Sequence, residues 1–554
     1  MLGTWPRQCA KGCNFGRRRL RAAAVTMPCD ANTWRVWRSF CACAACELMA
    51  GQVYIFGLWS DVLRRSGGLA LGQASVESVA ISENLGQYVR LAGGLAFDTW
   101  GAQATLRVGF VLNGVGFLAV FAATHLAESA DAGHWRMPLP ALCAFAATFG
   151  QGAGWVETAV VSTAVESFSD EAPGLLKTFF GIAAAFGSMA FAAILAPRRD
   201  LLLLGLGLAP LLIGLPLSGL VRPPAPPAGS KTWAPWGAAY ALCFLAVMVL
   251  TLHSALASMT PLLRPYEDHR LANLLAFGVV CALFAAIPLL PLCQATPGGS
   301  SDTPLARHAT VNAQDDCTFL QAMCKPTFWC LFCALGAGYG AGLLVLNNMG
   351  QLVKALDRGS PELQPVCVTI FAVFNATGRL AMGQAAASET MGGRRTLLLA
   401  GTLAATAVAY VGSSLAEGPK ALGAALPFLG LGYGSLWTLQ PLLASELFGK
   451  ISFGAKYAML SMAAVAGSLP LCRFVVPYFY DQHAGEDGWC VGAECFRGSL
   501  LTAAGFCGVG AALSLALDCS RNGAWAYATM WTQEQADAEE HREATIAGRS
   551  SPGA

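Results

Sequence analysis

Ionisable and amide side chains stand inside apolar segments that are long enough to cross a membrane. Glu47 lies midway along one such segment, and Glu83, Gln87 and Arg90 follow at intervals of four and three residues in the next. This spacing places the last three on one stripe of a helix. An ionised side chain at a bilayer centre costs about 2.5–3.5 kcal/mol on insertion scales, so such residues face a cavity or a partner.

These charges have two interpretations. In the first, they line a polar cavity in which Arg90 is the counter-ion of an anionic solute and Glu47 or Glu83 carries a proton. In the second, Glu83 and Arg90 form a structural pair that neutralises itself. Asn347 and Asn348 are further candidates to bind the solute through their amides, the alternative being hydrogen bonds between helices.

The chain as a whole has the composition of a membrane protein. Of its 554 residues, 55% are hydrophobic and 12% are charged, and the mean hydropathy is +0.51. A soluble protein of this length could not bury so much apolar surface. The net charge of +2 comes without a basic patch interleaved with aromatics, so we expect no nucleic-acid partner.

Hydropathy and segment length predict about fourteen membrane-spanning helices. The expected organisation is a basic N-terminal tail (1–35), a six-helix bundle (36–220), a Pro-rich linker (221–236), two inserted helices (237–293), a flexible polar loop (294–326), a second six-helix bundle (327–519) and a charged C-terminal tail (520–554). An even number of spans places both ends on one side, and the basic tail predicts the cytoplasmic side. The tail could instead be an organelle transit peptide or precede a true start at Met27.

The fourth helix of each predicted bundle carries a repeated pattern. At an offset of 280 residues, "FGQGAGWVETAVVSTAVESF" aligns without a gap with "LGLGYGSLWTLQPLLASELF". Three glycines in each segment coincide, and Glu166 coincides with Glu446. Repeated bundles are typical of transporters in which two similar halves rock about a site at the bilayer midplane. The alternative is convergent membrane composition.

Six segments, in their order and spacing, carry the pattern of a known family. They are "AGQVYIFGLWSDVL" (50–63), "ENLGQYVRLAGGLAFD" (83–98), "FWCLFCALGAGYGAGLLVLNNMGQL" (328–352), "FAVFNATGRLAMG" (371–383), "ASELFGKISFG" (444–454) and "CVGAECFR" (490–497). The chain resembles the nodulin-like (nuclear fusion defective) branch of the major facilitator superfamily. The resemblance implies an all-α polytopic fold of two six-helix bundles and a secondary transporter, whose relatives move organic anions such as monocarboxylates and oxalate.

The loop after the second helix departs from the superfamily pattern Gly-x3-Asp-x2-Gly-Arg-Arg. The copy in the first bundle keeps Gly94, Asp98 and Gly101 but lacks the basic pair. The copy in the second bundle keeps Arg394 and Arg395 but lacks the acid. Neither half therefore has a complete copy.

Charged residues at the inner helix ends predict a gate. Glu166 and Glu446 lie too far from the midplane to bind a solute, and Glu446 is expected within reach of Arg394 or Arg395. We therefore expect a cytoplasmic latch that breaks and reforms as the bundles rock, built from Asp98, Glu166, Arg394, Arg395 and Glu446.

Most of the twenty cysteines lie in apolar runs, where cysteine behaves as a small hydrophobe. Cys490 and Cys495 are different because they share a polar loop, and a disulfide is expected there if the loop faces an oxidising side. No cluster has zinc-ligand spacing, so no metal is expected. The sequence has no nucleotide-binding loop, nucleophile elbow or HExxH, which argues against an enzyme and against a cofactor.

We therefore expect a monomeric major facilitator protein with two extra helices between its bundles. It would move a small organic solute, an organic anion such as a monocarboxylate being favoured, by alternating access driven by protons across a lipid bilayer. The alternative is a non-transporting membrane sensor or scaffold on the same fold. Symport and antiport both stay open, as do the plasma membrane, the vacuole and an organelle.

Overall fold

The structure is a computed structural model that describes residues 31–64, 69–129, 137–196, 198–222, 235–259, 270–292, 316–356, 363–388, 394–485 and 490–520. The first 30 residues with Met27, most of the Pro-rich linker, most of the polar loop before the second bundle and the C-terminal tail after Ser520 lie outside these ranges. Within them the chain is helical, and an isolated bridge between Ala484 and Cys490 is its sole β-type pairing.

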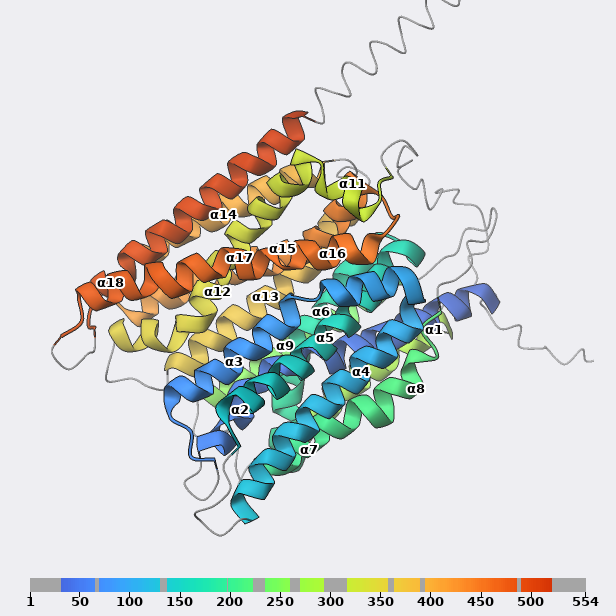
Figure 1. Ribbon diagram of the computed structural model, residues 1–554, viewed down its shortest axis with the longest axis horizontal. Coiled ribbons are helices and arrows are strands. Elements are labelled where there is room, and N and C mark those ends of the chain that lie inside the picture. The colour runs from blue at the N-terminus through green and yellow to red at the C-terminus, as the bar shows by residue number, and fades with distance from the viewer. Residues whose placement is uncertain are drawn as a thin grey trace, which may run out of the picture.

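The first half of the molecule is built from helices that run in colour from blue to green in Figure 1. They are α1 (Ala31–Ala50), η1 (Gly51–Ile55), α2 (Phe56–Trp59), η2 (Ser60–Arg64), α3 (Gln73–Tyr88), α4 (Leu91–Ser129), α5 (Leu139–Ser167), α6 (Glu171–Ala190), η3 (Phe191–Leu195), α7 (Arg199–Ala209), η4 (Pro210–Gly214) and α8 (Leu215–Ser218). Two inserted helices follow, α9 (Trp236–Met259) and α10 (Arg270–Ala286), the second extended by η6 (Ile287–Leu292).

The second half runs from yellow-green to red in Figure 1. It consists of α11 (Phe319–Met323), α12 (Pro326–Leu356), α13 (Leu363–Ala387), α14 (Arg395–Ser414), α15 (Pro419–Phe448), α16 (Phe453–Ser461), α17 (Ala463–Pro470), η8 (Leu471–Val475) and α18 (Val476–Gln482). A last long helix spans Glu494–Ser520.

Twelve helical stretches of the described residues are long and apolar enough to cross a membrane. One of them, Ser75–Ala127, is 53 residues long and contains Gly101, whose φ of 78° turns the chain between two successive passes. Helix α5 is not among the twelve, since polar residues such as Gln151 and Glu157 interrupt it, but its 29 residues are long enough for another pass. The helices thus agree with the predicted number of about fourteen.

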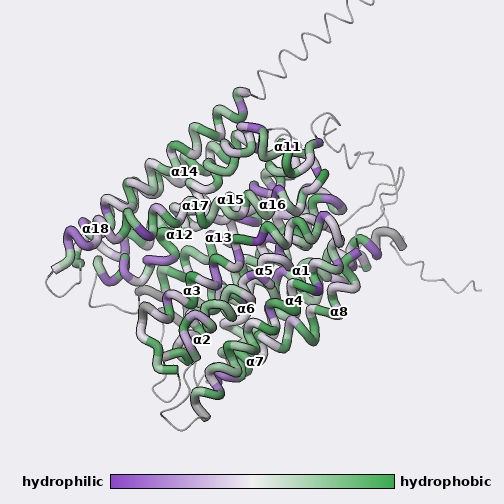
Figure 2. Tube along the Cα trace, viewed as in Figure 1, coloured by the Kyte–Doolittle hydropathy of each residue, from purple (hydrophilic) through white to green (hydrophobic). Residues whose placement is uncertain are grey.

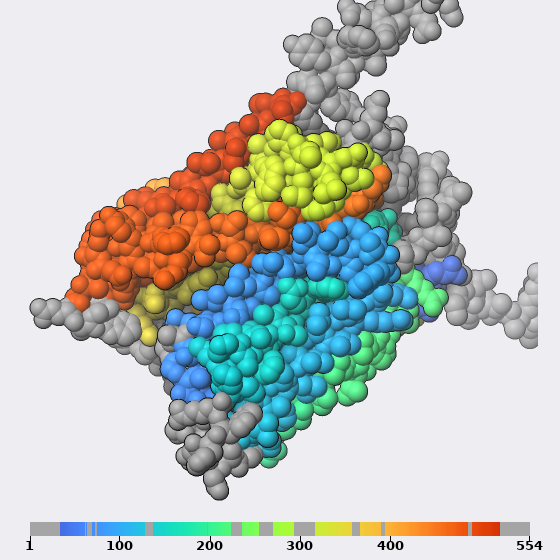
Figure 3. Space-filling view, in the orientation of Figure 1, coloured from blue at the N-terminus to red at the C-terminus, as the bar shows by residue number. Residues whose placement is uncertain are grey.

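The two halves lie side by side and meet along a single boundary on the face drawn in Figure 3. Across this seam α4 packs against α16 and α6 packs against α13. Apolar residues dominate the outer helices, and hydrophilic stretches gather at helix ends and in the interior around α5, α13 and α16 (Figure 2). The polar interior lies therefore at the seam, between two separate apolar cores.

Pairs of glycines allow the halves to touch backbone to backbone at both crossings of the seam. Gly94 of α4 lies against Gly454 of α16, and Gly174 of α6 lies against Gly383 of α13. A Cβ on Gly174 would lie 2.6 Å from the Cα of Gly383. Gly174 and Gly454 are 280 residues apart, so the repeated pattern in the sequence corresponds to two equivalent crossings.

The fourth helix of each half is packed in the same way. α15 begins 280 residues after α5, and the two helices end at equivalent positions to within one residue. A Cβ on Gly150 of α5 would clash with the carbonyl oxygen of Glu83 in α3, and one on Gly430 of α15 would lie 2.6 Å from the carbonyl oxygen of Phe371 in α13. Two residues further on, Gly152 faces α4 in the first half and Gly432 faces α14 in the second half. These small residues let each fourth helix fit between its neighbours.

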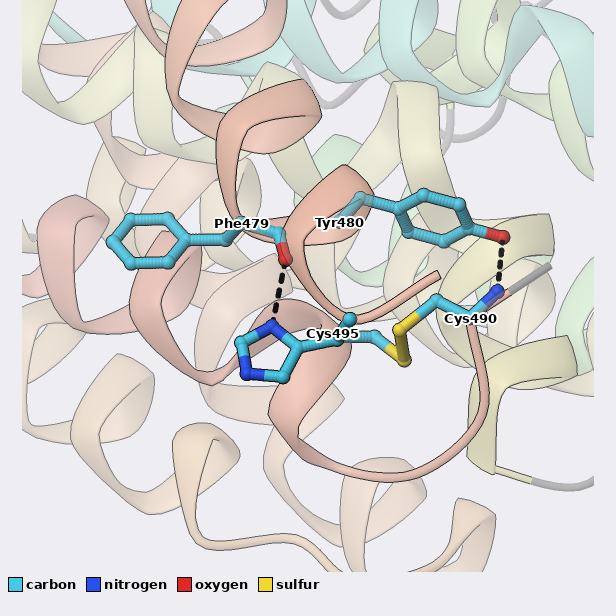
Figure 4. The surroundings of a disulfide bond; sticks show 5 residues. Phe479, Tyr480, Cys490 and Cys495 are labelled. Carbon is cyan, nitrogen blue, oxygen red and sulfur yellow. Dashed lines mark hydrogen bonds between the residues drawn. A yellow bond between two sulfur atoms is a disulfide. The ribbon is translucent and has the colours of Figure 1, made fainter. Parts of the chain in front are cut away.

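Cys490, in the segment before the last helix, and Cys495, in the first turn of that helix, form a disulfide (Figure 4). The Tyr480 hydroxyl accepts a hydrogen bond from the backbone N–H of Cys490 at 3.3 Å. The backbone N–H of Gly492 donates to the carbonyl of Ala355, at the end of α12, at 2.8 Å. The loop is therefore fixed to two helices of the second half.

The disulfide is testable by alkylation. In denatured, unreduced protein, we expect the peptide with Cys490 and Cys495 to escape iodoacetamide, whereas reduction before alkylation should add two groups to it. Cys519, a free and exposed cysteine, should be alkylated in both samples and serves as the internal control. Alkylation of Cys490 without reduction, read by mass spectrometry, would contradict the bond.

Gly150→Ala should lower the free energy of unfolding in detergent by about 1–3 kcal/mol, because the new methyl group forces α3 away from α5. Gly423→Ala is the matched control, since a Cβ at this helical position meets no other atom within 4 Å and alanine favours the helix. Thermal melting of the purified variants measures the difference. Equal melting temperatures would show that α3 and α5 are not in close contact.

Candidate functional site

The second membrane pass is interrupted near its middle. Val89 and Arg90 separate α3 from α4, and Val89 leaves the helical region with a ψ of 69°. The side-chain amide of Gln151 in α5 donates a hydrogen bond to the carbonyl oxygen of Val89, at 2.5 Å. Non-helical backbone at membrane depth is tolerated where protein buries it or a cavity adjoins it. The interruption turns Arg90 inward, and its side chain is fully buried.

Arg90 and Lys177 share one carboxylate. The Arg90 guanidinium donates to Oε2 of Glu157, and the Lys177 ammonium donates to Oε1. The three side chains are 0–3% exposed and come from the α3–α4 break, α5 and α6. We call Arg90, Glu157 and Lys177 the ion cluster. It carries one negative and two positive formal charges.

The ion cluster reaches across the seam to α16. Arg90 Nη2 donates to the Ser461 hydroxyl at 2.7 Å, and the Tyr457 hydroxyl donates to Glu157 at 3.3 Å. The Tyr457 ring lies 5.0 Å from the Arg90 guanidinium, and the Lys177 ammonium lies 5.1 Å from the Trp437 ring. Aromatic faces attract cations at such distances, so the second half stabilises charges that the first half supplies.

A second buried arginine occupies the equivalent place in the second half. The carbonyl oxygens of Gln87 and Asn375 face Gly154 and Gly434, which coincide in the repeat. Arg90 comes three residues after Gln87, and Arg379 comes four residues after Asn375. The two arginines therefore have nearly equivalent positions in the two halves.

Arg379 has no carboxylate partner. Its Nη1 donates to the Lys177 carbonyl at 2.6 Å and its Nε donates to Asn375 at 3.2 Å, and the residue is 1% exposed. No carboxylate in the described part of the chain lies within salt-bridge distance. The repeat gives the reason, because Trp437 stands where the first half has Glu157. Among the described residues, Arg379 is therefore a buried cation without an ion-pair partner.

Glu47 of α1 is fully buried beside these groups. Within the described residues neither of its carboxylate oxygens has a hydrogen-bond partner. The charges of Glu157, Lys177, Arg90 and Arg379 all act on it electrostatically. Glu47 is thus near the ion cluster without being paired to it.

The structure places the other predicted binding residues apart from the ion cluster. Glu83 is buried in α3, but Arg90 pairs with Glu157, so the internal Glu83–Arg90 pair does not form. Asn348 donates to a carbonyl of its own helix, α12, at 2.8 Å. Asn347 is exposed, and its amide lies 3.9 Å from a cysteine sulfur of η8.

A cavity of about 390 Å³ lies near Arg379. It is lined by η1, α2, α6, η3, α9 and α13. Tyr54 lines it and is 36% exposed. Gly181 of α6 also lines it, and Arg379 Nε lies 3.0 Å from the position a Gly181 Cβ would take. Arg379 does not itself line the cavity, but its side chain contacts Gly181, which does.

The predicted latch residues lie at the other end of the bundle. Asp98 accepts hydrogen bonds from the backbone N–H groups of Gly454 and Ala455, at 2.8 and 2.9 Å, at the start of α16. A helix N-terminus favours a carboxylate. The contact joins the first half to the second.

Arg395 makes a second contact across the same end. It lies 3.4 Å from the Glu446 carboxylate and also forms an ion pair with Asp170, in the turn between α5 and α6. Arg394 is exposed at the start of α14. Glu166 is exposed near the end of α5, where the charges of Asp98 and Lys450 act on it.

Sequence reasoning did not select Lys177, Arg379 or Asp170 as site residues. For Lys177 and Arg379 the signal was present, since both are basic residues inside apolar segments. The repeat offers a further signal, because Lys177 coincides with Tyr457 and Gly181 with Ser461. Asp170 has no such signal, since its partner belongs to the other half.

Glu157→Gln should lower the free energy of unfolding by about 3–5 kcal/mol, because Arg90 and Lys177 lose the charge that compensates them. Adding Lys177→Met removes one of the two unpaired cations and should recover part of the loss, which thermal melting would detect. Independent sites would instead show additive losses. A double variant less stable than Glu157→Gln alone would contradict a shared ion cluster.

Comparison with known proteins assigns the family. The Nodulin-like family matches residues 36–292, and the NFD4 C-terminal domain matches residues 317–525. The protein NUCLEAR FUSION DEFECTIVE 4 of Arabidopsis thaliana is 24% identical over 516 residues, which are 84% of this chain and 85% of the relative.

Among solved structures, the major facilitator proton:xylose symporter bound to 6-bromo-6-deoxy-D-glucose has a TM-score of 0.51 at 12% identity. The match covers 88% of this chain and 94% of the symporter. It establishes the fold, which agrees with the two helical halves and the seam described above. The chain is an integral, multi-pass membrane protein with the major facilitator fold, and it belongs to the nodulin-like, NUCLEAR FUSION DEFECTIVE 4-related family.

Proposed function

We propose that the protein is a secondary active transporter that moves a small organic anion by alternating access, coupled to protons. The observation that carries the proposal is Arg379, a buried arginine to which the described residues supply no carboxylate partner and which contacts Gly181 in the lining of a cavity. The likeness in fold to a proton:xylose symporter supports transport as the activity.

An anionic solute would supply the charge that Arg379 lacks. An unpaired charge away from water is unfavourable, so such residues belong by default to binding sites. Guanidinium groups bind carboxylates through two parallel hydrogen bonds, which gives both strength and orientation. Arg90 and Lys177, whose combined charge exceeds that of Glu157 by one, add to the positive potential at the same depth. The site therefore favours an anion over a neutral solute or a cation.

Glu47 is suited to carry the coupled proton. It is buried, its oxygens lack partners in the described residues, and Arg379 lies within electrostatic range. A change in its protonation breaks no ion pair but alters the charge near Arg379. Proton uptake and anion binding would then favour each other. Glu83, which is also buried, is the second candidate.

The latch supports the alternating-access part of the proposal. Asp98 and Arg395 close one end of the seam, whereas the cavity lies toward the other end of α6. Basic residues in the N-terminal tail favour a cytoplasmic position for the tail and hence for the latch. We propose that these contacts separate as the halves rock, with Glu166 and Arg394 at the rim, and that one polypeptide is sufficient for the cycle.

Uptake into proteoliposomes tests the proposal. Labelled organic anions, amino acids and sugars are offered with and without an inward proton gradient, and we expect gradient-driven, saturable uptake of an organic anion. Arg379→Gln should raise the half-saturating concentration about 10- to 100-fold, the effect of losing a hydrogen bond to a charged group. Uptake of sugars alone, or no uptake of any solute as for a sensor or scaffold, would refute it.

The role of Glu47 is tested by separating exchange from accumulation. Glu47→Gln should abolish accumulation driven by the proton gradient while leaving the exchange of internal for external anion. Glu417→Gln changes an exposed carboxylate between α14 and α15 and should retain both activities. If Glu47→Gln still accumulates the anion against its gradient, Glu47 does not carry the proton.

A further inference from the structure

We propose that the inserted helix α9 forms one wall of the solute site, and that the transported anion is therefore an amphipathic carboxylate whose apolar part lies against α9. The inference rests on the proposed function and specifies the substrate class of the same site. It also assigns a role to a helix that lies outside both six-helix bundles.

The position of α9 is fixed at the seam between the halves. The Tyr240 hydroxyl donates to the carbonyl of Glu171, at the start of α6, at 2.8 Å. It also fills the space at the crossing of α6 and α13, since it lies 3.0 Å from a Cβ built on Gly174 and 2.5 Å from one built on Gly383. A larger residue at either glycine would displace the tyrosine. Helix α9 therefore contacts both halves at once.

The next turns of α9 face the cavity. Val247, Leu250, Thr251 and His253 line it, and Val247 and Leu250 are only 2% and 3% exposed. Leu252 is 61% exposed and belongs to the opposite, outer face of the helix. His253 lies 2.7 Å from Asn273 of α10, so the two inserted helices are joined beside the cavity. One face of α9 thus closes the gap between α6 and α13.

The cavity lining is mainly apolar, and a cation lies next to it. The wall that faces α9 includes the small apolar residues Ala184, Ala185 and Ala372, together with the hydroxyl groups of Ser188 and Thr369. Arg379 does not line the cavity but contacts Gly181, which does. A solute with one carboxylate and a hydrocarbon part matches this arrangement. The cavity of about 390 Å³ is at the small end of the range for ligand sites.

Other solutes fit less well. A sugar needs several hydrogen-bond partners around its ring, whereas most of the cavity lining is apolar and its polar side chains are Tyr54, Ser188, Thr251, His253 and Thr369. A small dicarboxylate has too little hydrocarbon to contact the apolar wall, and its second carboxylate would be placed unpaired against that wall. For an amphipathic carboxylate, each methylene buried on the wall should tighten binding about fourfold.

The test is a ligand series on the purified full-length protein in detergent. Acetate, butyrate, hexanoate and octanoate are titrated, and the rise in melting temperature gives an apparent dissociation constant for each. We expect affinity to increase with chain length until the cavity is filled. Hexanol and hexylammonium, which have the same chain without the carboxylate, should bind at least tenfold more weakly than hexanoate.

Variants on the two faces of α9 then show where the hydrocarbon chain of the ligand binds. Leu250→Trp fills the cavity and should weaken octanoate binding at least tenfold while changing acetate binding less than twofold. Leu252→Trp adds the same side chain on the outer face and should change neither. Leu250→Ala is used if Leu250→Trp does not fold, and it should weaken octanoate more than acetate, because it removes apolar contacts.

The outcomes separate the two proposals. If no carboxylate binds, or if hexanol binds as well as hexanoate, the proposed anion site is wrong. If carboxylates bind and Arg379→Gln weakens all of them, but both Leu250 variants keep the wild-type dependence on chain length, the anion site stands and the role of α9 is refuted. Equal effects of Leu250→Trp and Leu252→Trp would also refute it.

Discussion

The pairing of two cations with Glu157 is the interaction on which the rest of the structure depends. A lone Arg90 or Lys177 at membrane depth would be strongly unfavourable, and one carboxylate stabilises both. The pairing requires α3, α5 and α6 to converge, which explains the break at Val89 and the glycines of α5 that admit α3. It also leaves the ion cluster with one more positive than negative formal charge, because one acid balances two bases.

The two halves have similar backbones but different chemistry at equivalent positions. Where the first half has Glu157 and Lys177, the second has Trp437 and Tyr457. The first half therefore supplies ions, and the second supplies aromatic faces and hydroxyls that contact them across the seam. This loss of symmetry is the reason why Arg379 has no carboxylate partner among the described residues. In the proposed function, a pseudo-symmetric scaffold would thus acquire a single oriented anion site rather than two equivalent ones.

Much of the fold follows from the sequence, because segment length and hydropathy decide which helices cross a membrane. The same reasoning found Glu47 and Arg90, since depth in an apolar segment is visible in one dimension. It did not identify Glu157 as the partner of Arg90, because partners on different helices depend on helix rotation and packing. Asn347 and Asn348 show the same limit, since periodicity alone did not indicate that one of them is exposed.

The inserted helices give the seam a second asymmetry. Both crossings are made by glycine pairs, but Tyr240 of α9 covers only the crossing of Gly174 with Gly383. Any rocking of the halves would therefore have either to keep or to break the contacts of α9 with α6 and α13. If α9 keeps its contacts near Tyr240, movement there is small and the cavity beside Leu250 changes most. In the proposed function, the same helix would then separate the cavity from lipid while the opposite end of the seam opens.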